Sequence, residues 1–329
     1  MNAVLSVRDL NVGFSASAHA VRGVSFDVYP GETLCIVGES GSGKSMTSLA
    51  VMGLLPPAAR LSASSILLEG KELVGLSPNE LNQLRGSRMA MIFQEPMTSL
   101  NPSMRIGEQM IEGLRHHGKA SHEQAWKRAV ELLAWTGIGD TQARMSMYPH
   151  QLSGGLRQRV MIAMSLMCSP SLLIADEPTT ALDVTTQLKI LGLLSNVQKK
   201  FGTAILLITH DLGVVAKVAD RVAVMYGGKI VEAGPAQDVL KAPRHPYTRA
   251  LLDCLPQAHQ GELLKVIPGS IPVFKETSLG CGFASRCVHA GTRCDDDALL
   301  EAKFAAGARC VRPISYAPTQ AARTGGIHA

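Results

Sequence analysis

The stretch GESGSGKS, residues 38–45, constrains the fold of this chain more than any other segment. The apolar residues 33–37 before it read as a buried strand, and the apolar segment that begins at Lys44 has the length of a helix. A glycine-rich turn between a strand and a helix directs backbone N–H groups and the positive end of the helix at an anion. The GxxxxGKS spacing is that of the P-loop, which cradles the phosphates of a nucleoside triphosphate. A turn that fits by chance is the weaker interpretation, because the strand and the helix are both in place.

Each position of the loop has an expected part in nucleotide binding. The glycines allow the backbone to turn so that its N–H groups face a triphosphate. Lys44 is expected to reach the β- and γ-phosphates, and the hydroxyl of Ser45 is expected to bind Mg²⁺. The predicted ATP-binding residues of the loop are Gly38, Glu39, Ser40, Gly41, Ser42, Gly43, Lys44 and Ser45.

Two further apolar segments end in side chains that can act on a phosphate. The segment SLLIADEP places Asp176 and Glu177 directly after apolar residues, and TAILLITHD reaches His210 in the same way. In open α/β folds, ligands bind beyond the carboxyl ends of parallel strands. We expect Asp176 to hold the Mg²⁺ shell, Glu177 to polarise an attacking water and His210 to reach the γ-phosphate. A solvated acidic turn and a structural histidine are the alternatives when each segment is taken alone.

The segment LSGGL, residues 152–156, distinguishes among the P-loop families. It resembles the signature motif of the ATP-binding cassette (ABC) ATPases, and the order of the other motifs agrees with that family. Gln94 in MIFQEP resembles the Q-loop glutamine, Asp183 at the end of TTALD the D-loop aspartate, and His210 the switch histidine. Together with Phe14, described below, these motifs span residues 14–210 and follow one another in the same order as in the ABC family. So many motifs in the same order are not explained by chance.

The resemblance implies that two cassettes face each other head to tail, with each ATP between the P-loop of one and the signature of the other. Ser153, Gly154 and Gly155 would supply a hydroxyl and backbone N–H groups to the second ATP. Leu156 stands where the family consensus has glutamine, a departure that leaves those donors intact. The family pattern assigns catalysis to Glu177, His210 and Gln94, and Mg²⁺ binding to Ser45, Gln94 and Asp176.

Phe14 in NVGF lies where the family places an aromatic side chain that stacks on adenine. Phenylalanine keeps the π-face of the more usual tyrosine and loses only its hydroxyl. A buried core aromatic is the alternative for this position.

The chain as a whole is expected to be an α/β protein with a P-loop ATPase core built on a mixed or parallel sheet. Residues 1–240 form the predicted ABC nucleotide-binding domain, with a helical subdomain inserted at about residues 98–165. In that insertion, as in EQAWKRAVELLAWTGI, apolar positions recur at helical spacing. The family uses such a subdomain to contact a membrane subunit, whereas plain packing helices would have the same pattern. Residues 241–329 are predicted to form a small, irregular C-terminal extension that carries a cysteine-ligated cluster.

The C-terminal extension indicates a subgroup within the ABC ATPases. APRHPYTRALL, residues 242–252, is followed by IPGSIP and a group of cysteines, and the whole closely resembles the C-terminal region of dipeptide and oligopeptide importer ATPases. The resemblance implies an ATP-hydrolysing translocase subunit on the cytoplasmic face of the cell membrane. Its implied partners are two transmembrane permease subunits, an extracytoplasmic peptide-binding protein and a second, different ABC ATPase, for which a copy of this chain is the alternative. Nickel and glutathione importers carry similar extensions and are the alternative for the cargo.

Other function classes fit the chain less well. The net charge of +5 is not gathered into runs, so nucleic acid is not an expected partner. The N-terminus lacks the pattern of a secretory signal, and the uncharged run at residues 160–175 is shorter than the ~20 apolar residues of a membrane span. A soluble ABC ATPase of translation or DNA repair would show two cassettes or a long coiled-coil insertion. A regulatory cassette would lack Lys44, Glu177 or His210, and all three are present.

Four cysteines of the extension, Cys281, Cys287, Cys294 and Cys310, are separated by five, six and fifteen residues. The spacing lacks the paired CxxC of most zinc sites and matches neither ferredoxin pattern, so zinc, an iron–sulfur cluster and unligated thiols all stay open. The resemblance implies a 4Fe–4S cluster with these four residues as ligands, in a structural or redox-sensing role. The remaining cysteines are expected in the apolar core: Cys35, Cys168 and Cys254.

Overall fold

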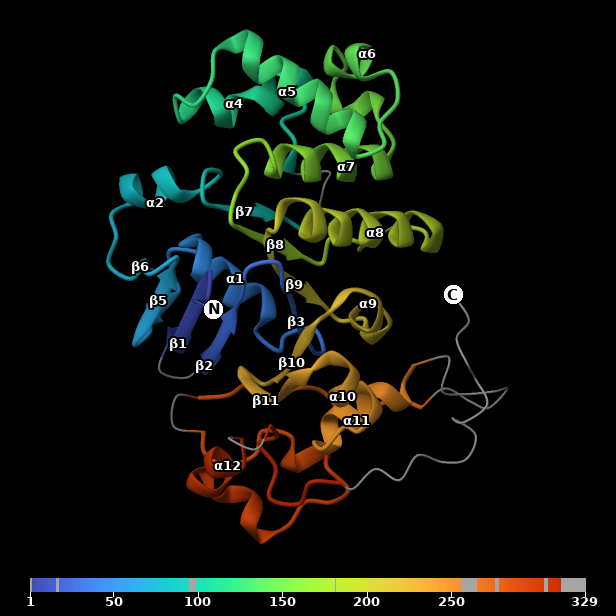
Figure 1. Ribbon diagram of the computed structural model, residues 1–329. Coiled ribbons are helices and arrows are strands. Elements are labelled where there is room, and N and C mark those ends of the chain that lie inside the picture. Colours follow the sequence, from blue (N-terminus) through green and yellow to red (C-terminus); the bar gives the residue numbers. More distant parts are fainter. Residues whose placement is uncertain are drawn as a thin grey trace.

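Two β-sheets and the helices that cover them make up the described part of the chain, in the computed structural model drawn in Figure 1. The structure describes residues 2–15, 18–94, 99–180, 182–255, 265–275, 278–304 and 307–314. The larger sheet contains, in spatial order, β11 (Lys229–Pro235), β10 (Arg221–Tyr226), β3 (Thr33–Val37), β9 (Ala204–Thr209), β8 (Leu172–Asp176) and β7 (Met89–Ile92). Neighbouring strands from β10 to β7 are parallel, and β11 is antiparallel to β10. The predicted α/β class with a mixed sheet is confirmed.

The central strands of the larger sheet are buried on both faces, which explains their composition. Every residue of β3, β8 and β9 is buried. Parallel strands that are covered on both sides are continuous apolar runs rather than alternating ones. The three apolar segments that the sequence predicts as strands are these three.

The smaller sheet is antiparallel and lies beside the P-loop helix α1 (Lys44–Met52). Its order is β2-β1-β5-β6, and β4 also pairs with β1. One hydrophobic core fills the space between the two sheets with side chains from β1, β2, α1 and the larger sheet. The short helix α2 (Pro78–Leu84) follows, and it begins at a capping box in which Ser77 and Glu80 bond each other's backbone N–H groups. The strands are β1 (Leu5–Ser15), β2 (Ala18–Val28), β4 (Arg60–Ser62), β5 (Ser65–Leu68) and β6 (Lys71–Glu72).

A group of helices inserted between β7 and β8 forms the helical subdomain. In Figure 1 it lies above the larger sheet, with α7 nearest to the sheet. A helical subdomain is present, as the sequence predicts, and its described helices begin at Ile106; residue 98, where the predicted range begins, lies outside the described residues. Two further helices, α8 (Val184–Phe201) and α9 (Leu212–Val218), cover the sheet. The subdomain comprises α4 (Ile106–His116), α5 (His122–Trp135), α6 (Thr141–Met145), the 3₁₀ helix η1 (Pro149–Gln151) and α7 (Gly154–Ser165).

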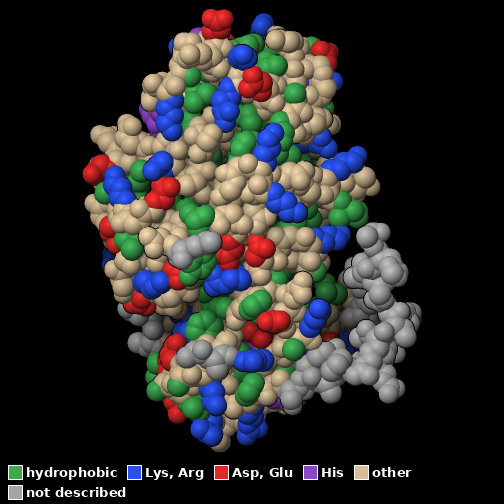
Figure 2. Space-filling view, in the orientation of Figure 1, with side chains coloured by type: hydrophobic (Ala, Val, Ile, Leu, Met, Phe, Trp, Pro, Cys, Tyr) green, Lys and Arg blue, Asp and Glu red, His purple; other side chains and the backbone are tan. Residues whose placement is uncertain are grey.

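The face of the molecule drawn in Figure 2 is mixed in charge and also exposes hydrophobic side chains. Basic and acidic side chains are interspersed on the face drawn in Figure 2. Within the described ranges, no helix combines the length and the apolar composition needed to cross a bilayer.

The C-terminal extension is more regular than the sequence predicts. After α10 (Ala236–Lys241) it contains α11 (Pro246–Asp253), α12 (Asp297–Phe304) and the 3₁₀ helices η3 (Ala284–Arg286) and η4 (Thr292–Asp295). The chain then returns to the edge strand β11. There the Ala233 N–H donates to the carbonyl of Gly307 (3.0 Å), and the Arg309 N–H donates to the carbonyl of Val231 (2.7 Å). The prediction of an irregular extension is therefore wrong in part, because long-range pairing with a strand leaves no local sequence pattern.

Three buried aromatic side chains join the extension to the larger sheet. Tyr226 of β10, Tyr247 of α11 and Phe283 have ring centroids 4.7 to 5.3 Å apart. Each such pair contributes about 0.5–1.5 kcal/mol beyond the burial of its area. All three belong to the hydrophobic core that also contains the helical subdomain. The extension therefore shares the core of the cassette.

A buried carboxylate also ties the extension to β11. Glu232 is 2% exposed, and its oxygens accept hydrogen bonds from the backbone N–H groups of Arg244 (2.7 Å) and His245 (3.0 Å) at the start of α11. Burial raises the pKa of Glu232, and its hydrogen bonds oppose that shift. The carboxylate thus satisfies backbone donors that would otherwise be buried without an acceptor.

We expect Glu232→Ala to lower the free energy of unfolding by about 2–4 kcal/mol, because it leaves two backbone donors without their acceptor. Urea unfolding followed by circular dichroism measures the change. Gln237→Ala on the exposed side of the neighbouring helix α10 is the matched control, and it should change stability by no more than ~0.5 kcal/mol. Equal stability of the two variants would show that the carboxylate does not anchor the extension.

Candidate nucleotide-binding site

The parallel strands β3, β9, β8 and β7 are neighbours and end at the same edge of the larger sheet. β3 runs into the P-loop, and β8 ends at Asp176 with Glu177 next in the chain. His210 directly follows β9, and Gln94 lies two residues beyond β7. Since the carboxyl ends of parallel strands lie side by side, these side chains gather around the P-loop.

Two glycines of the P-loop are required by close packing. Gly38 lies so near β10 that a Cβ atom would collide with the carbonyl oxygen of Met225. Gly43 has a φ of 103°, and a Cβ there would collide with the carbonyl oxygen of Ala20. The loop therefore passes between the two sheets at positions that only glycine can occupy. At its tip, Ser40 and Gly41 are exposed.

Lys44, the first residue of α1, holds its ammonium group inside the loop. Its Nζ donates hydrogen bonds to the carbonyl oxygens of Gly38 (2.8 Å) and Glu39 (2.9 Å). Burial lowers the pKa of Lys44, and the carboxylates of Glu177 and Asp176 oppose the shift. The ammonium can exchange these two carbonyls for phosphate oxygens without leaving the loop, since a charged acceptor makes the stronger hydrogen bond.

The predicted Mg²⁺ ligands come together only in part. The Ser45 hydroxyl donates to the Asp176 carboxylate (3.0 Å), so these two residues share one site. Ser48, one turn further along α1, also faces this carboxylate at 3.5 Å. Burial raises the pKa of Asp176, and the hydrogen bond from Ser45 opposes the shift. The sequence analysis missed Ser48, although its spacing of three residues from Ser45 puts both hydroxyls on one helix face.

The predicted catalytic residues converge on one carboxylate. Glu177 Oε1 lies 3.2 Å from Nδ1 of His210, and Glu177 Oε2 accepts a hydrogen bond from Nε2 of Gln94 (3.1 Å). The Thr180 hydroxyl donates to the same Oε2 (2.9 Å), a contact that the sequence analysis missed. Gln94 therefore lies on the Glu177 side of the site, away from the hydrogen bond between Ser45 and Asp176.

The environment of Glu177 keeps its carboxylate ionised. Burial raises the pKa of Glu177, and the hydrogen bonds with His210 and Thr180 lower it. Their lowering effect outweighs the effect of burial, so the pKa of Glu177 lies below its usual value. The Glu177 side chain is 13% exposed and that of His210 is 59% exposed. An ionised carboxylate held in this way can accept a hydrogen bond from a water molecule near a bound phosphate.

The signature residues lie at the start of α7, which belongs to the helical subdomain above the sheet (Figure 1). Ser153 is the N-cap of this helix and accepts a hydrogen bond from the Leu156 N–H (3.4 Å). Ser153 and Gly154 are exposed, so their donors face outward. Leu156 packs against the hydrophobic core, which explains why an apolar residue is tolerated there.

A threonine of α8 connects the D-loop residue to the signature. Asp183 is the N-cap of α8 and accepts hydrogen bonds from the N–H (3.0 Å) and the hydroxyl (2.6 Å) of Thr186. The methyl group of Thr186 lies where a Cβ on Gly155 would stand. A glycine at position 155 thus allows α7 and α8 to approach closely. Thr186 is another residue that the sequence analysis missed.

Phe14 lies near the end of β1 and is 42% exposed. The alternative of a buried core aromatic is therefore wrong. A ring exposed to this extent is accessible for stacking on a planar ligand.

The four cysteines of the extension line one small pocket together with His245 and His289. Cys294 and Cys310 are buried, and Cys281 and Cys287 are half-buried. Burial raises the pKa of Cys281 to about 11, and the neighbouring thiols add to the shift. In the described ranges, no group of three or more histidine, cysteine, aspartate or glutamate side chains is arranged to hold a metal ion. The predicted ligands therefore share one pocket but are not arranged around a common metal position.

The other cysteines depart in part from the prediction of core residues. Cys35 is fully buried in β3, as expected, and Cys168 packs half-buried against the same core. Cys254 instead lines a surface pocket beside α11, so the prediction is wrong for this residue.

Two protein families match separate parts of the chain. The family described as "ABC transporter" matches residues 21–180. The one described as "Oligopeptide/dipeptide transporter, C-terminal region" matches residues 231–294. The first match covers the P-loop and the acidic residues Asp176 and Glu177 at the end of β8, and the second covers the start of the extension.

Known proteins match over nearly the whole chain. The dipeptide transport ATP-binding protein DppD of Bacillus subtilis is 50% identical over 300 residues, which cover 90% of this chain and 90% of that protein. The oligopeptide transport ATP-binding protein OppD of Escherichia coli is 48% identical over 319 residues, which cover 95% of this chain and 94% of that protein.

Solved structures match the cassette part. The ATP-binding cassette MJ0796, described as a dimer bound to ADP and Pi, is 27% identical with a TM-score of 0.63 over 70% of this chain and 98% of its own. The protein cbiO1 of Clostridium perfringens, described as part of the ABC transporter complex cbiONQ, is 31% identical with a TM-score of 0.64 over 73% of this chain and 91% of its own. The predicted cassette fold is confirmed by these matches.

Glu177→Gln should reduce ATP turnover in the assembled complex by about 10² or more, because the amide keeps the size of the side chain but lacks the negative charge that polarises the attacking water. The affinity for ATP should be retained, since the phosphate-binding loop is unchanged. Thr180→Val is the matched control: it removes one hydrogen bond to the carboxylate and should cost no more than about tenfold. Steady-state phosphate release measures both variants. An unchanged rate for Glu177→Gln would contradict this role of the carboxylate.

Proposed function

The chain belongs to the ATPase subunits of dipeptide and oligopeptide importers in the ABC family, and we propose that it hydrolyses ATP at the P-loop edge of its larger sheet to power peptide uptake. One observation carries the site assignment. The Glu177 carboxylate is bonded to Gln94 and His210, and it directly follows Asp176, which is bonded to Ser45 of the P-loop. Side chains from four separate segments thus form one arrangement suited to phosphoryl transfer to water.

Nucleotide binding is assigned to the P-loop and its surroundings. Backbone N–H groups of the P-loop other than that of Glu39, together with the ammonium of Lys44, hold the β- and γ-phosphates. A hydroxyl, a carboxylate and an amide oxygen are donors that suit Mg²⁺. The ion would offset charge on the transferring phosphate, held by Ser45, Asp176 and Gln94. Gln94 would use its amide oxygen, since its amide nitrogen donates to Glu177. Phe14 is assigned to adenine, because its ring is exposed.

Hydrolysis is assigned to Glu177 and His210. The Glu177 carboxylate accepts a hydrogen bond from the attacking water and directs it at the γ-phosphate. A base with a lowered pKa removes a proton poorly, so orientation and polarisation of the water are its main contribution. His210 lies within hydrogen-bonding distance of this carboxylate and is exposed enough to reach the γ-phosphate as well.

Each bound ATP is assigned to a position between two cassettes, so the signature of this chain faces the ATP that the second cassette holds. Ser153 and Gly154 are exposed at the N-terminus of α7, where a helix can bind the phosphates of a nucleotide held by a partner. Gly155 and the D-loop Asp183 complete this surface. The dimeric structure of MJ0796, 27% identical, supports a paired arrangement. We propose a second, different cassette as the partner.

Uptake also requires subunits that cross the membrane. We propose that this chain lies on the cytoplasmic face of the cell membrane, bound to two transmembrane permeases through its helical subdomain. An extracytoplasmic peptide-binding protein would deliver the cargo. The names of DppD and OppD, which are dipeptide and oligopeptide transport ATP-binding proteins, support the peptide class. We propose that residues 1–240 form the nucleotide-binding domain and that residues 241–329 form the C-terminal extension.

The pocket of the extension is the proposed site of a 4Fe–4S cluster, with Cys281, Cys287, Cys294 and Cys310 as ligands. Four thiols lining one pocket match the donor set that such a cluster requires. Burial favours the protonated form of Cys281, and iron would stabilise its thiolate instead. Such a group would supply a structural staple or a redox-sensing centre. It lies in the extension, so no step of ATP hydrolysis is assigned to it.

We expect the isolated chain to hydrolyse ATP about 10²-fold more slowly than the assembled complex, because the donors of the opposing signature are missing. Phosphate release by the purified chain is compared with that of the complex with permeases and partner cassette, at equal concentrations of P-loops. Full activity of the isolated chain at high dilution would contradict the shared site.

Anaerobic purification of the full chain should give a brown protein with broad visible absorbance and about four iron atoms and four sulfides, the content of one cysteine-ligated 4Fe–4S cluster. Cys287→Ser should lose the colour and the iron, whereas Cys168→Ser, which lies away from the pocket, should retain both. A colourless protein that carries one zinc ion, or four thiols that react without denaturant, would rule out the cluster.

A further inference from the structure

Glu39, the second residue of the P-loop, is held by hydrogen bonds at its amide, its carbonyl and its carboxylate. Its N–H donates to the hydroxyl of Tyr247 (2.9 Å), and its carbonyl accepts from Lys44 (2.9 Å). Its carboxylate forms a bidentate pair with Arg286, with Nη1–Oε2 at 2.8 Å and Nη2–Oε1 at 3.0 Å. Two of these three partners, Tyr247 and Arg286, come from the C-terminal extension. The extension therefore contacts the nucleotide loop directly.

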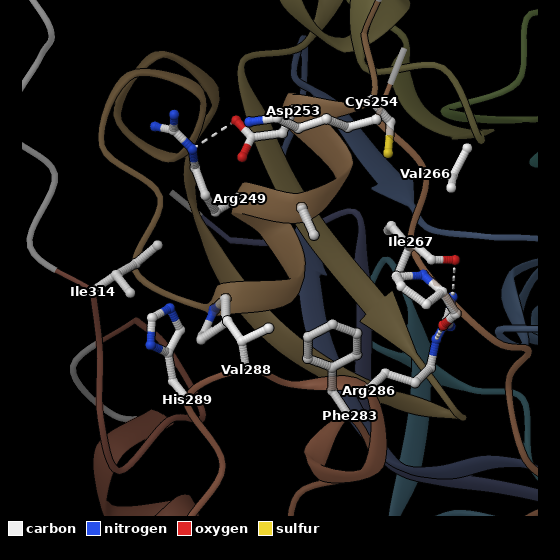
Figure 3. A pocket seen from close by; sticks show the side chains of 14 residues that line it. Arg249, Asp253, Cys254, Val266, Ile267, Phe283, Arg286, Val288, His289 and Ile314 are labelled. Carbon is white, nitrogen blue, oxygen red and sulfur yellow. Dashed lines mark hydrogen bonds and ion pairs between the residues drawn. The ribbon is translucent and has the colours of Figure 1, made fainter. Parts of the chain in front are cut away.

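Arg286 is fixed in place by its own surroundings. Its side chain is 5% exposed, and its remaining N–H groups donate to the carbonyls of Pro268 (2.7 Å) and Ile267 (3.2 Å). Its guanidinium lies over the ring of Phe283 at 5.9 Å. Figure 3 shows Arg286 beside Ile267 and Phe283 at the edge of the pocket under α11. A planar guanidinium held in this way presents its fork to a carboxylate at little entropic cost.

Tyr247 is equally well fixed. It is fully buried, and its ring packs on Tyr226 with centroids 4.7 Å apart. His245 caps the start of α11 by accepting the N–H of Tyr247 at its Nδ1 (3.1 Å). The HPYT segment thus places a tyrosine hydroxyl at the backbone of the P-loop.

The charge of Glu39 makes this clamp important for an anionic ligand. Burial lowers the pKa of Lys44, and Glu39 is one of the carboxylates that oppose the shift, so it is electrostatically coupled to the lysine that reaches the phosphates. A carboxylate at this position would repel a triphosphate if it were unpaired. The ion pair with Arg286 offsets the negative charge of the Glu39 carboxylate and holds this carboxylate toward the extension.

We propose that Arg286 and Tyr247 are positioning residues for nucleotide binding, which clamp Glu39 so that its carboxylate stays off the phosphates and its backbone keeps the shape of the P-loop. The inference rests on the proposed role of the P-loop in binding ATP. Through these two residues the extension would contribute to ATP binding, a role separate from the one proposed for the thiol pocket.

The clamp and the thiol pocket belong to the same short segments. Arg286 directly precedes Cys287, and His245, which orients Tyr247, has its Nε2 at 3.9 Å from Sγ of Cys281. The fold of the cysteine loop therefore determines where Arg286 stands.

Equilibrium binding of MgATP to the full chain tests the clamp. Arg286→Ala should weaken binding about tenfold, because a partly buried carboxylate is left unpaired beside the phosphates. Arg286→Gln keeps donors for the neighbouring carbonyls but not the charge, and it should weaken binding to a similar extent if the pairing with Glu39 is what matters. Tyr247→Phe should cost about threefold, since it removes one acceptor from the loop.

The rescue variant separates positioning from a merely structural role. Glu39→Gln combined with Arg286→Ala should restore the affinity to within about threefold of the unmodified chain, because the repelling charge is gone. Loss of folding in Arg286→Ala would not be repaired by a change in the P-loop. In the assembled transporter, Arg286→Gln should raise KM for ATP and leave kcat within about twofold.

Two controls keep the outcomes distinct. Arg249 lines the same pocket but pairs with Asp253 within α11. The variant Arg249→Ala should therefore bind MgATP normally. Lys44→Ala should lose binding, and normal binding by that variant would overturn the role of the P-loop itself. If Lys44→Ala loses binding while both Arg286 variants bind normally, or if Glu39→Gln fails to restore affinity, the clamp is overturned and the P-loop assignment stands.

Discussion

The parallel register of β3, β9 and β8 is the constraint on which the site depends. Val37, the last residue of β3, pairs with Thr209, and Asp176, the last residue of β8, pairs with Ile208 of the same central strand β9. The three strands therefore end within one residue of each other. Whatever follows them in the chain must meet at one edge of the sheet. The P-loop, the two acidic residues and His210 are neighbours in space for this reason, although they are far apart in the sequence.

The predicted side chains that the structure brings together are those whose position follows from this rule. A buried apolar run followed by a chemically active side chain, as at Glu177, indicates the carboxyl edge of a strand without any knowledge of the rest of the fold. Contacts made by a helix face or a turn were missed, as with Ser48 and Thr180. The pairing of Arg286 with Glu39 was also missed, because the two residues are 247 positions apart and no local pattern joins them.

The extension shows how a segment without a large core of its own can still be ordered. Its aromatic residues join the core of the cassette, and Glu232 satisfies the backbone at the start of α11. The same packing brings Tyr247 and Arg286 to the P-loop. The sequence suggested a separate, irregular module because it contains short motifs rich in glycine, proline and cysteine. In the structure the extension instead contacts the P-loop directly, at Glu39.

The most direct test of the account is the structure of the assembled importer with MgATP, determined with Glu177→Gln to retain the nucleotide. The account predicts that Nζ of Lys44 has left the carbonyls of Gly38 and Glu39 for the β- and γ-phosphates, while Arg286 still holds the Glu39 carboxylate. It also predicts that the γ-phosphate faces the signature of the second cassette. A nucleotide bound away from residues 38–45, or a Glu39 carboxylate turned to the phosphates with Arg286 displaced, would contradict it.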